Sequence, residues 1–217
     1  MTKGTAVFID GASLSGMRYP LSIRNYAYPG LLKVLQTIST APIHGKPLYV
    51  VPKDGDGPWT KTLRTLGFDV VVSPTKNGQD DRLIIQRISA LKRDHVDEII
   101  IVSTDQDYAP ALKQKTNEGF LVHWVGTRKN DRDGTSPMGS ALLGLCDTGV
   151  FSFTELAEHR EAITREAMPV ETPDNPRRSV TVTLKVSLLH SELERLLRRI
   201  GALLKLYPSA QFTLDNK

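Results

Sequence analysis

The chain has 217 residues, 40% of them hydrophobic and 24% charged, which is the composition of a globular protein with room for one domain and a small appendage. Its single cysteine, Cys146, excludes an internal disulfide and a cysteine-based metal cluster, and its net charge of +4 is compatible with a nucleic-acid partner without requiring one. No apolar run approaches the ~20 residues of a membrane span and the N-terminus lacks a signal-peptide pattern, so we expect a cytoplasmic protein that does not bind membranes.

Strands and helices alternate along the first three quarters of the chain. Apolar, β-branched runs predict strands, and between them apolar residues recur at the three- and four-residue spacing of helices. Such an alternation is typical of a mainly parallel sheet covered on both faces, so we predict a doubly wound α/β fold. In chain order, the predicted strands are 5–9, 46–51, 68–73, 98–103 and 120–125, and the predicted helices are 28–39, 59–66, 82–91 and 108–117.

The last quarter of the chain has a different organisation. Three prolines between residues 169 and 176 indicate a linker. Beyond it, an alternating strand, a leucine-rich helix that begins with a capping box, and a short closing strand are predicted. We therefore divide the chain into a main domain at 1–158, a helix end and proline-rich linker at 159–178, and a strand–helix–strand appendage at 179–217. The appendage is too small to stand alone, so it docks on the main domain or joins two copies into a homodimer.

Five aspartates follow predicted strands. Asp10 ends the first strand, Asp80 and Asp81 lie between the third strand and the next helix, and Asp105 and Asp107 follow the fourth strand. Because the carboxyl ends of parallel strands meet at one edge of a sheet, we expect these carboxylates to converge. Converging carboxylates repel one another, and a hard divalent cation such as Mg²⁺ or Mn²⁺ relieves that repulsion. Each acid taken singly also has a simpler interpretation, as a turn residue or a helix cap.

The segments that carry these acids resemble the NYN domain, a branch of the PIN-like nucleases. The resemblance rests on F-I-D-G-A-S-L at 8–14, N-G-Q-D-D-R-L-I at 77–84 and V-S-T-D-Q-D-Y-A-P at 102–110, and it covers about residues 5–157. It includes the segment 136–147, where the family has a helix leading to a last short strand. The resemblance implies a PIN-like fold whose clustered acids hold Mg²⁺ or Mn²⁺ and cut RNA.

Carried over residue by residue, the resemblance assigns roles to all five aspartates. We expect Asp10 and Asp105 to be direct metal ligands, Asp80 to complete the inner set, and Asp81 and Asp107 to bind the metal through water. The residues predicted to be catalytic are Asp10, Asp80, Asp105 and Asp107.

Two positions depart from the family pattern. Ser13 stands where the family usually has asparagine, and Gln86 stands where many members carry a further acid. Fewer carboxylates weaken metal binding. The alternative to a metal-dependent ribonuclease is therefore a weak or inactive relative that binds RNA and metal in a regulatory role.

Polar and basic residues near the same edge are candidates for contact with RNA. Phosphates attract basic side chains, and Trp59 could stack on a base. Charged loops are more often simply solvated, and a tryptophan in a helix more often lies in a core. The predicted substrate-binding residues are Ser13, Lys53, Arg82, Arg128 and Lys129.

Overall fold

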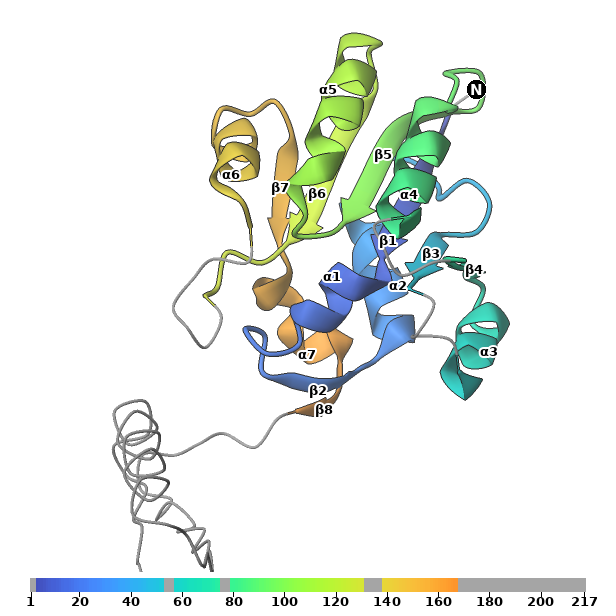
Figure 1. Cartoon of the computed structure of the whole chain (residues 1–217), viewed down its shortest axis with the longest axis vertical. Coiled ribbons are helices and arrows are strands. Elements are labelled where there is room, and N and C mark those ends of the chain that lie inside the picture. The colour runs from blue at the N-terminus through green and yellow to red at the C-terminus, as the bar shows by residue number, and fades with distance from the viewer. Residues whose placement is uncertain (1–2, 53–56, 75–78, 131–137, 168–217) are drawn as a thin grey trace, which may run out of the picture. The chain divides into compact units, whose positions relative to one another are not determined.

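The computed structural model describes residues 3–52, 57–74, 79–130 and 138–167, which belong to one compact unit, Met1–Pro169 (Figure 1). At its centre is a six-stranded sheet of order β4-β3-β1-β5-β6-β7 in which each pair of neighbouring strands is parallel. The α/β prediction is therefore confirmed. The strands of this sheet are β1 (Gly4–Asp10), β3 (Leu48–Val51), β4 (Asp69–Val72), β5 (Val96–Val102), β6 (Leu121–Gly126) and β7 (Ser152–Glu155).

The order of the strands reverses between β1 and β5. From β1 the chain first builds outward through β3 and β4, and then returns to continue through β5, β6 and β7 on the other side. Ile9 of β1 lies opposite Val102 of β5, so the carboxyl ends of these two strands are adjacent. In open parallel sheets, a ligand site forms at the carboxyl ends of the strands where the order reverses.

Helices cover both faces of the sheet. Successive side chains of a strand point to opposite faces, so Val7 and Ile9 of β1 enter one hydrophobic cluster while Ala6 and Phe8 enter the other. The first cluster also takes in α1, α2, α3 and α7, and the second takes in α4, α5 and α6 (Figure 1). The helices are α1 (Gly11–Gly16), α2 (Tyr28–Ile38), α3 (Pro58–Thr65), α4 (Gln79–Ser89), α5 (Ala109–Asn117), α6 (Ser140–Asp147) and α7 (Arg160–Ile163), with 3-10 turns η2 (Gln106–Tyr108) and η3 (Leu156–His159).

All the strands and helices predicted from hydrophobic spacing are present, with ends that differ by at most three residues. The helix and last strand implied by the family resemblance are α6 and β7. The elements that were not predicted include α1 and a separate antiparallel pair, β2 (Ile23–Tyr26) with β8 (Thr164–Ala167). The partner of β2 lies far along the chain, and its I-R-N-Y sequence has no strict alternation of apolar and polar residues.

The compact unit continues past residue 158, where we predicted that the main domain ends. A Cβ atom on Gly30 of α2 would lie 1.8 Å from the carbonyl oxygen of Ala162, so α2 and α7 pack backbone against backbone. Ile163 is fully buried, and β8 pairs with β2. Residues 159–167 are therefore part of the domain, because they bury apolar surface and complete a sheet. The rest of the predicted linker and the appendage at 179–217 lie outside the described residues.

A buried carboxylate lies at the opposite end of the sheet from the five aspartates. Glu98 of β5 is 1% exposed and accepts hydrogen bonds from the Thr5 hydroxyl and from the backbone N–H of Thr40. Its Oε1 also lies 2.8 Å from Nε2 of His123 on the neighbouring strand β6. Burial alone would raise the pKa of Glu98, but these hydrogen bonds and the nearby imidazole hold it below its usual value. This network is structural, since it ties β1, β5, β6 and the end of α2 together.

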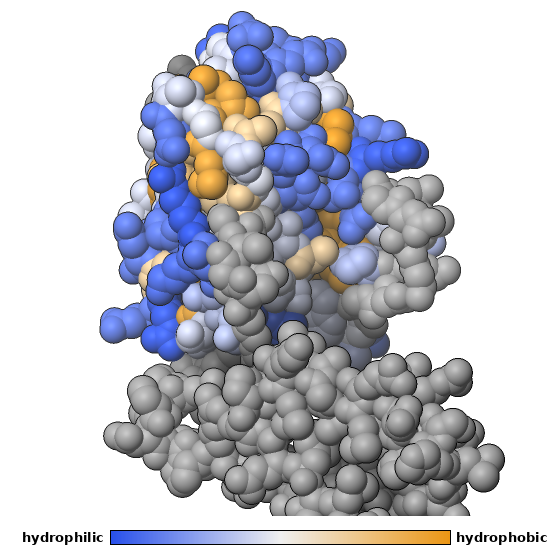
Figure 2. Space-filling model, turned by 60° about the vertical axis from the view of Figure 1, so that its left-hand side comes forward, coloured by the Kyte–Doolittle hydropathy of each residue, from blue (hydrophilic) through white to orange (hydrophobic). Residues whose placement is uncertain are grey.

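One face of the domain, shown in Figure 2, is mainly hydrophilic, with small hydrophobic patches between polar side chains. The exposed large hydrophobic side chains of the described residues are Tyr19, Trp59 and Leu121. Trp59 therefore lies at the surface of α3 and not in the core. Within the same ranges, no helix is both long and apolar enough to cross a membrane.

Candidate functional site

Three segments of the chain bring acidic side chains to the edge of the sheet where the strand order reverses. Asp10 is the last residue of β1, and Asp105 and Asp107 follow the adjacent strand β5. The first turn of α4 carries Asp80 and Asp81. Buried strands thus fix two of the segments, and a helix that packs on the same strands fixes the third.

Asp10 is the most enclosed of these acids, with only 4% of its surface exposed. Its Oδ1 accepts hydrogen bonds from the backbone N–H groups of Ala12 and Ser13, both at 3.0 Å, and thereby caps α1. Its Oδ2 accepts from the hydroxyls of Ser13 at 2.6 Å and Ser103 at 3.1 Å, and the Tyr108 hydroxyl lies 3.2 Å from it. Asp10 is therefore a helix cap and the centre of a buried polar cluster at the same time.

Tyr108 connects two of the acid-bearing segments. Its buried hydroxyl lies 2.6 Å from Oδ1 of Asp81 and 3.2 Å from Oδ2 of Asp10. A phenol has one hydrogen to donate, and the shorter distance shows that Asp81 receives it. Burial raises the pKa of Tyr108, and the charges of Asp10 and Asp81 raise it further, so the phenol stays a donor.

Ser103 holds the segment after β5 in place. Its hydroxyl accepts the backbone N–H of Asp105 at 3.0 Å, and its carbonyl oxygen accepts the indole N–H of Trp124 at 2.7 Å. Neither Ser103 nor Tyr108 was predicted from the sequence as a member of the site. The available signal was their position inside V-S-T-D-Q-D-Y-A-P, next to the acids.

Burial and neighbouring charges raise the pKa of two of the acids. Burial raises the pKa of Asp81, and the charges of Asp80, Asp10 and Asp105 add to that effect, while the hydrogen bond from Tyr108 opposes it. Burial also raises the pKa of Asp105, where the backbone N–H of Asp107 opposes the effect and the neighbouring carboxylates add to it. These carboxylates carry their charge at a cost that a bound cation would remove.

The oxygen donors of the site are of the kind that Mg²⁺ and Mn²⁺ prefer, because carboxylate and hydroxyl oxygens are hard ligands. The donor set therefore fits such an ion in its chemistry. Among the described residues, however, no three acidic, histidine or cysteine side chains stand close enough together to hold an ion. Protein donors already surround Asp10, and Tyr108 already engages Asp81.

The members of the two acidic pairs make different contacts in the structure. In the first pair, Asp81 accepts a hydrogen bond from the hydroxyl of Tyr108, which also lies 3.2 Å from Oδ2 of Asp10. In the second pair, Oδ1 of Asp105 accepts the backbone N–H of Asp107 at 2.9 Å, so Asp105 caps η2 and the exposed Asp107 does not act as the cap. The acid nearer the strand end caps the turn because only its side chain can reach the free N–H groups of the turn that follows.

The predicted RNA-binding residues fall into different environments. Arg128 pairs with Asp147 at 2.8 Å, and its guanidinium lies 4.6 Å from the centre of the Phe153 ring, so it is engaged within the domain. Arg82, next to Asp81, and Lys129 are exposed. Ser13 turns inward, where its hydroxyl contacts Asp10 and Ser103. Gln86 is exposed on α4, and Lys53 lies outside the described residues.

A doubly wound parallel sheet with acids gathered where the strand order reverses defines the domain as PIN-like. The family model described as the NYN domain matches residues 4–147, and the chain therefore belongs to the NYN domain family. This family lies within the PIN-like nucleases, which generally act on RNA. The match includes all three acid-bearing segments and ends with α6. Comparisons with curated proteins and with solved structures find no match.

Proposed function

We propose that the protein is a metal-dependent ribonuclease that hydrolyses RNA phosphodiester bonds at the carboxyl edge of its sheet. The observation that carries this proposal is the meeting of three acid-bearing segments of a NYN domain around the buried carboxylate of Asp10. We propose that Asp10, Asp81 and Asp105 hold Mg²⁺ or Mn²⁺, with Asp80 and Asp107 in supporting positions. A bound divalent ion supplies a water of lowered pKa and stabilises the negative charge that develops on the phosphate.

The residues of the chain position this chemistry. The hydroxyls of Ser13 and Ser103 hold Oδ2 of Asp10, and Tyr108 fixes Asp81 relative to Asp10, so the acids are held in place before a ligand arrives. The raised pKa values of Asp81 and Asp105 mean that protons compete with a cation for these carboxylates, and a bound cation favours loss of the protons. Binding of the ion is therefore expected to strengthen as the pH rises.

A second candidate function is an RNA-binding relative that does not cut efficiently. It is favoured by three observations. Protein donors surround the carboxylate of Asp10, and no three carboxylates of the described residues stand close enough together to hold an ion. Gln86, which replaces a further acid of many relatives, adds no negative charge to the site. Such a protein would bind RNA at the same edge and act through that binding.

A cleavage assay separates these two functions. The full chain is incubated with end-labelled single-stranded and structured RNA in Mg²⁺, Mn²⁺ or EDTA, beside Asp105→Asn and the control Asp94→Asn. The side-chain amide oxygen introduced by Asp105→Asn can still accept the backbone N–H of Asp107, so the turn is kept and only the charge is lost. Asp94 is exposed just before the amino end of β5, at the opposite edge of the sheet.

The ribonuclease proposal predicts cleavage by the wild type and Asp94→Asn in Mg²⁺ or Mn²⁺, and its loss in EDTA and in Asp105→Asn. Cleavage that survives both EDTA and Asp105→Asn contradicts it. Binding of RNA without cleavage under every condition supports the second function. A cytoplasmic location and a homodimer formed through 179–217 stay predictions from the sequence.

A further inference from the structure

A pocket of about 820 Å³ lies beside the acidic site. Gly11 and Ala12, directly after β1, line it together with Val51 and Pro52 at the end of β3. It therefore opens at the same edge of the sheet as Asp10. Its volume is within the range of about 300–1,000 Å³ that small-molecule sites occupy.

Four aromatic side chains line this pocket: Tyr26, Tyr28, Tyr49 and Trp59. Tyr28 and Trp59 each meet the buried Tyr49 ring edge to face, with ring centres 6.0 Å apart. Such contacts fix the orientation of the rings. Trp59 nevertheless remains 38% exposed, so a planar ligand can cover part of its surface.

The other notable residues of the lining are three arginines: Arg18, Arg24 and Arg165. Arg18 follows α1 and donates hydrogen bonds to the carbonyl oxygen and hydroxyl of Ser15 at 3.1 and 2.7 Å, which holds its guanidinium in place. Arg24 and Arg165 come from the paired strands β2 and β8. No acidic side chain of the described residues lines the pocket. Its charge is therefore positive, which favours an anionic ligand.

The pocket and the acidic site share a wall. A Cβ atom on Gly11 would lie 2.7 Å from Cε1 of Tyr49, so the Tyr49 ring packs directly on the residue after Asp10. A ligand in the pocket is consequently next to the carboxylates.

We propose that this aromatic–arginine pocket binds one nucleotide of single-stranded RNA, with its base on Trp59 and its phosphate against Arg18 or Arg165. Bases of any identity stack on aromatic rings, and arginine attracts the phosphate. The occupied pocket then presents the neighbouring phosphodiester to Asp10 and its partners. The inference rests on the proposed function for the identity of the ligand, and it assigns the place and the manner of binding.

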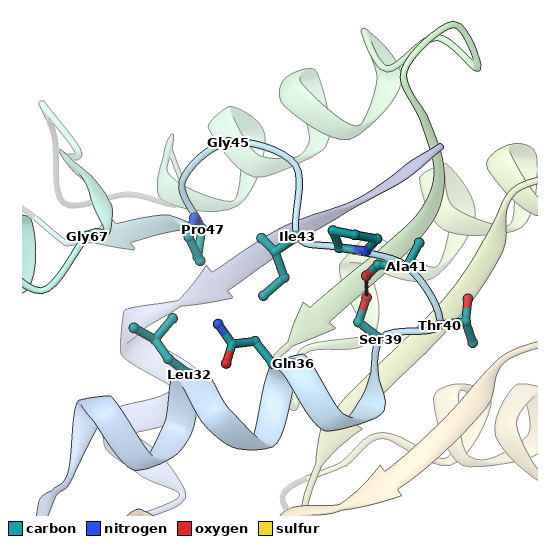
Figure 3. Close-up of a pocket in the computed structure, with 10 residues that line it drawn as sticks. Leu32, Gln36, Ser39, Thr40, Ala41, Ile43, Gly45, Pro47 and Gly67 are labelled. Atoms are coloured by element: carbon teal, nitrogen blue, oxygen red, sulfur yellow. Dashed lines mark hydrogen bonds between the residues drawn. The ribbon is translucent and has the colours of Figure 1, made fainter. Parts of the chain in front are cut away.

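A second pocket, of about 630 Å³, lies between α2 and the segment 39–47 near the amino ends of β1 and β3 (Figure 3). Its lining includes Leu32, Gln36 and Ile43, and no charged or aromatic side chain of the described residues. It offers neither a stacking surface nor a phosphate contact. Gln36 in this pocket therefore provides a matched control for substitutions in the aromatic–arginine pocket.

The two tryptophans of the chain allow a direct test, because Trp124 is fully buried and Trp59 is exposed. The full chain in EDTA is titrated with oligouridine RNA of about 12 nucleotides, within the range of single-strand binding sites. Binding is followed by tryptophan fluorescence and, independently, by anisotropy of labelled RNA. We expect RNA to quench the fluorescence of the wild type. Trp59→Phe should lose this quenching and keep binding in the anisotropy assay, because phenylalanine still stacks.

Substitutions that remove the contacts should weaken binding. Trp59→Ala is expected to raise the Kd about 5- to 100-fold, the loss of one base stack. Arg18→Ala is expected to raise the Kd and to reduce the dependence of the Kd on salt. Gln36→Ala and Lys61→Ala, an exposed cation of α3 outside the lining, should bind as the wild type does. Thermal unfolding of each variant verifies that it folds.

Three results of the binding and competition assays overturn the pocket proposal. These are wild-type affinity in Trp59→Ala, equal competition by base-free polyphosphate, and the absence of RNA binding by the wild type. A different combination of results contradicts the ribonuclease proposal and leaves the pocket proposal standing. Loss of binding in Trp59→Ala, together with a wild type that never cleaves RNA, supports the pocket and contradicts the ribonuclease. Cleavage by Trp59→Ala with unchanged kcat/KM contradicts the pocket alone.

Discussion

Replacing Asp10 tests whether this residue organises the site. Asp10→Ala removes the cap of α1, a loss of about 1 kcal/mol. It also removes the charged acceptor of the Ser13 and Ser103 hydroxyls, but two contacts persist: Ser13 to Ser103 at 3.0 Å and Tyr108 to Asp81 at 2.6 Å. About one hydrogen bond to a charged group is therefore lost in net terms, or about 1.5–3 kcal/mol. Because repulsion between the acids falls at the same time, we expect a total loss of about 2–3 kcal/mol of unfolding free energy.

The assay for this prediction is thermal unfolding in EDTA at pH 7, with Asp107→Ala as the control. For a domain of this size, a loss of about 2–3 kcal/mol lowers the Tm by about 4–12 °C. Asp107 is exposed and caps no turn, so its replacement should change the unfolding free energy by less than about 0.5 kcal/mol. Asp10→Asn keeps one acceptor oxygen, so its Tm should lie between those of Asp10→Ala and Asp107→Ala. If Asp10→Ala unfolds at the same temperature as Asp107→Ala, Asp10 does not organise the site.

Three further predictions concern the domain as a whole. Because the pKa of Asp81 is raised in the folded state, its contribution to stability is full below its unfolded pKa and is lost as the pH rises through the folded pKa. Asp81→Asn removes the charge and should therefore raise the Tm at pH 7 in EDTA. A lower Tm of this variant argues against charge repulsion at Asp81. The lowered pKa of Glu98 has the opposite sign, so urea unfolding of the wild type should show stability falling as the pH drops below about 4.5. Glu98→Gln should be less stable at pH 7 and lose most of that acid sensitivity, and an unchanged pH profile contradicts the role of this buried acid. Gly30→Ala should lower the Tm by several degrees, since its Cβ would lie 1.8 Å from the Ala162 carbonyl oxygen. The control Gly144→Ala, in open space on α6, should be neutral or stabilising by up to about 1 kcal/mol. Equal Tm values of the two variants refute the close packing of α2 on α7.

Much of the fold could be predicted from the sequence because its strands are continuous apolar runs. The positions of the acids directly after strands likewise predicted that the carboxylates meet at one edge of the sheet. Pro110 and Gly119 marked the ends of α5, where Gly119 has a φ of 87° that favours glycine. Elements whose partners lie far along the chain could not be predicted, as with β2 and β8, because their pairing depends on tertiary contacts and not on local pattern.

The detailed roles at the site were less predictable for the same reason. Two adjacent acids begin α4, and sequence alone does not say which one faces the sheet. The answer depends on Tyr108, which reaches Asp81 from a segment 27 positions further along the chain. Ser103 and Tyr108 are ordinary residue types whose importance comes from the carboxylates that surround them. Likewise, Trp59 lies at the surface because of the way α3 packs, and the spacing of apolar residues in the sequence did not predict this position.

The most direct test of the account measures the initial rate of RNA cleavage as Mn²⁺ is increased from an EDTA-treated start. The wild type, Asp81→Asn and the control Asp94→Asn are compared on the same labelled single-stranded RNA. The account predicts that the rate rises with Mn²⁺ for the wild type and Asp94→Asn, and that Asp81→Asn needs much more Mn²⁺ or does not cut. A rate that is independent of Mn²⁺, or the same Mn²⁺ dependence in Asp81→Asn as in the wild type, would contradict it.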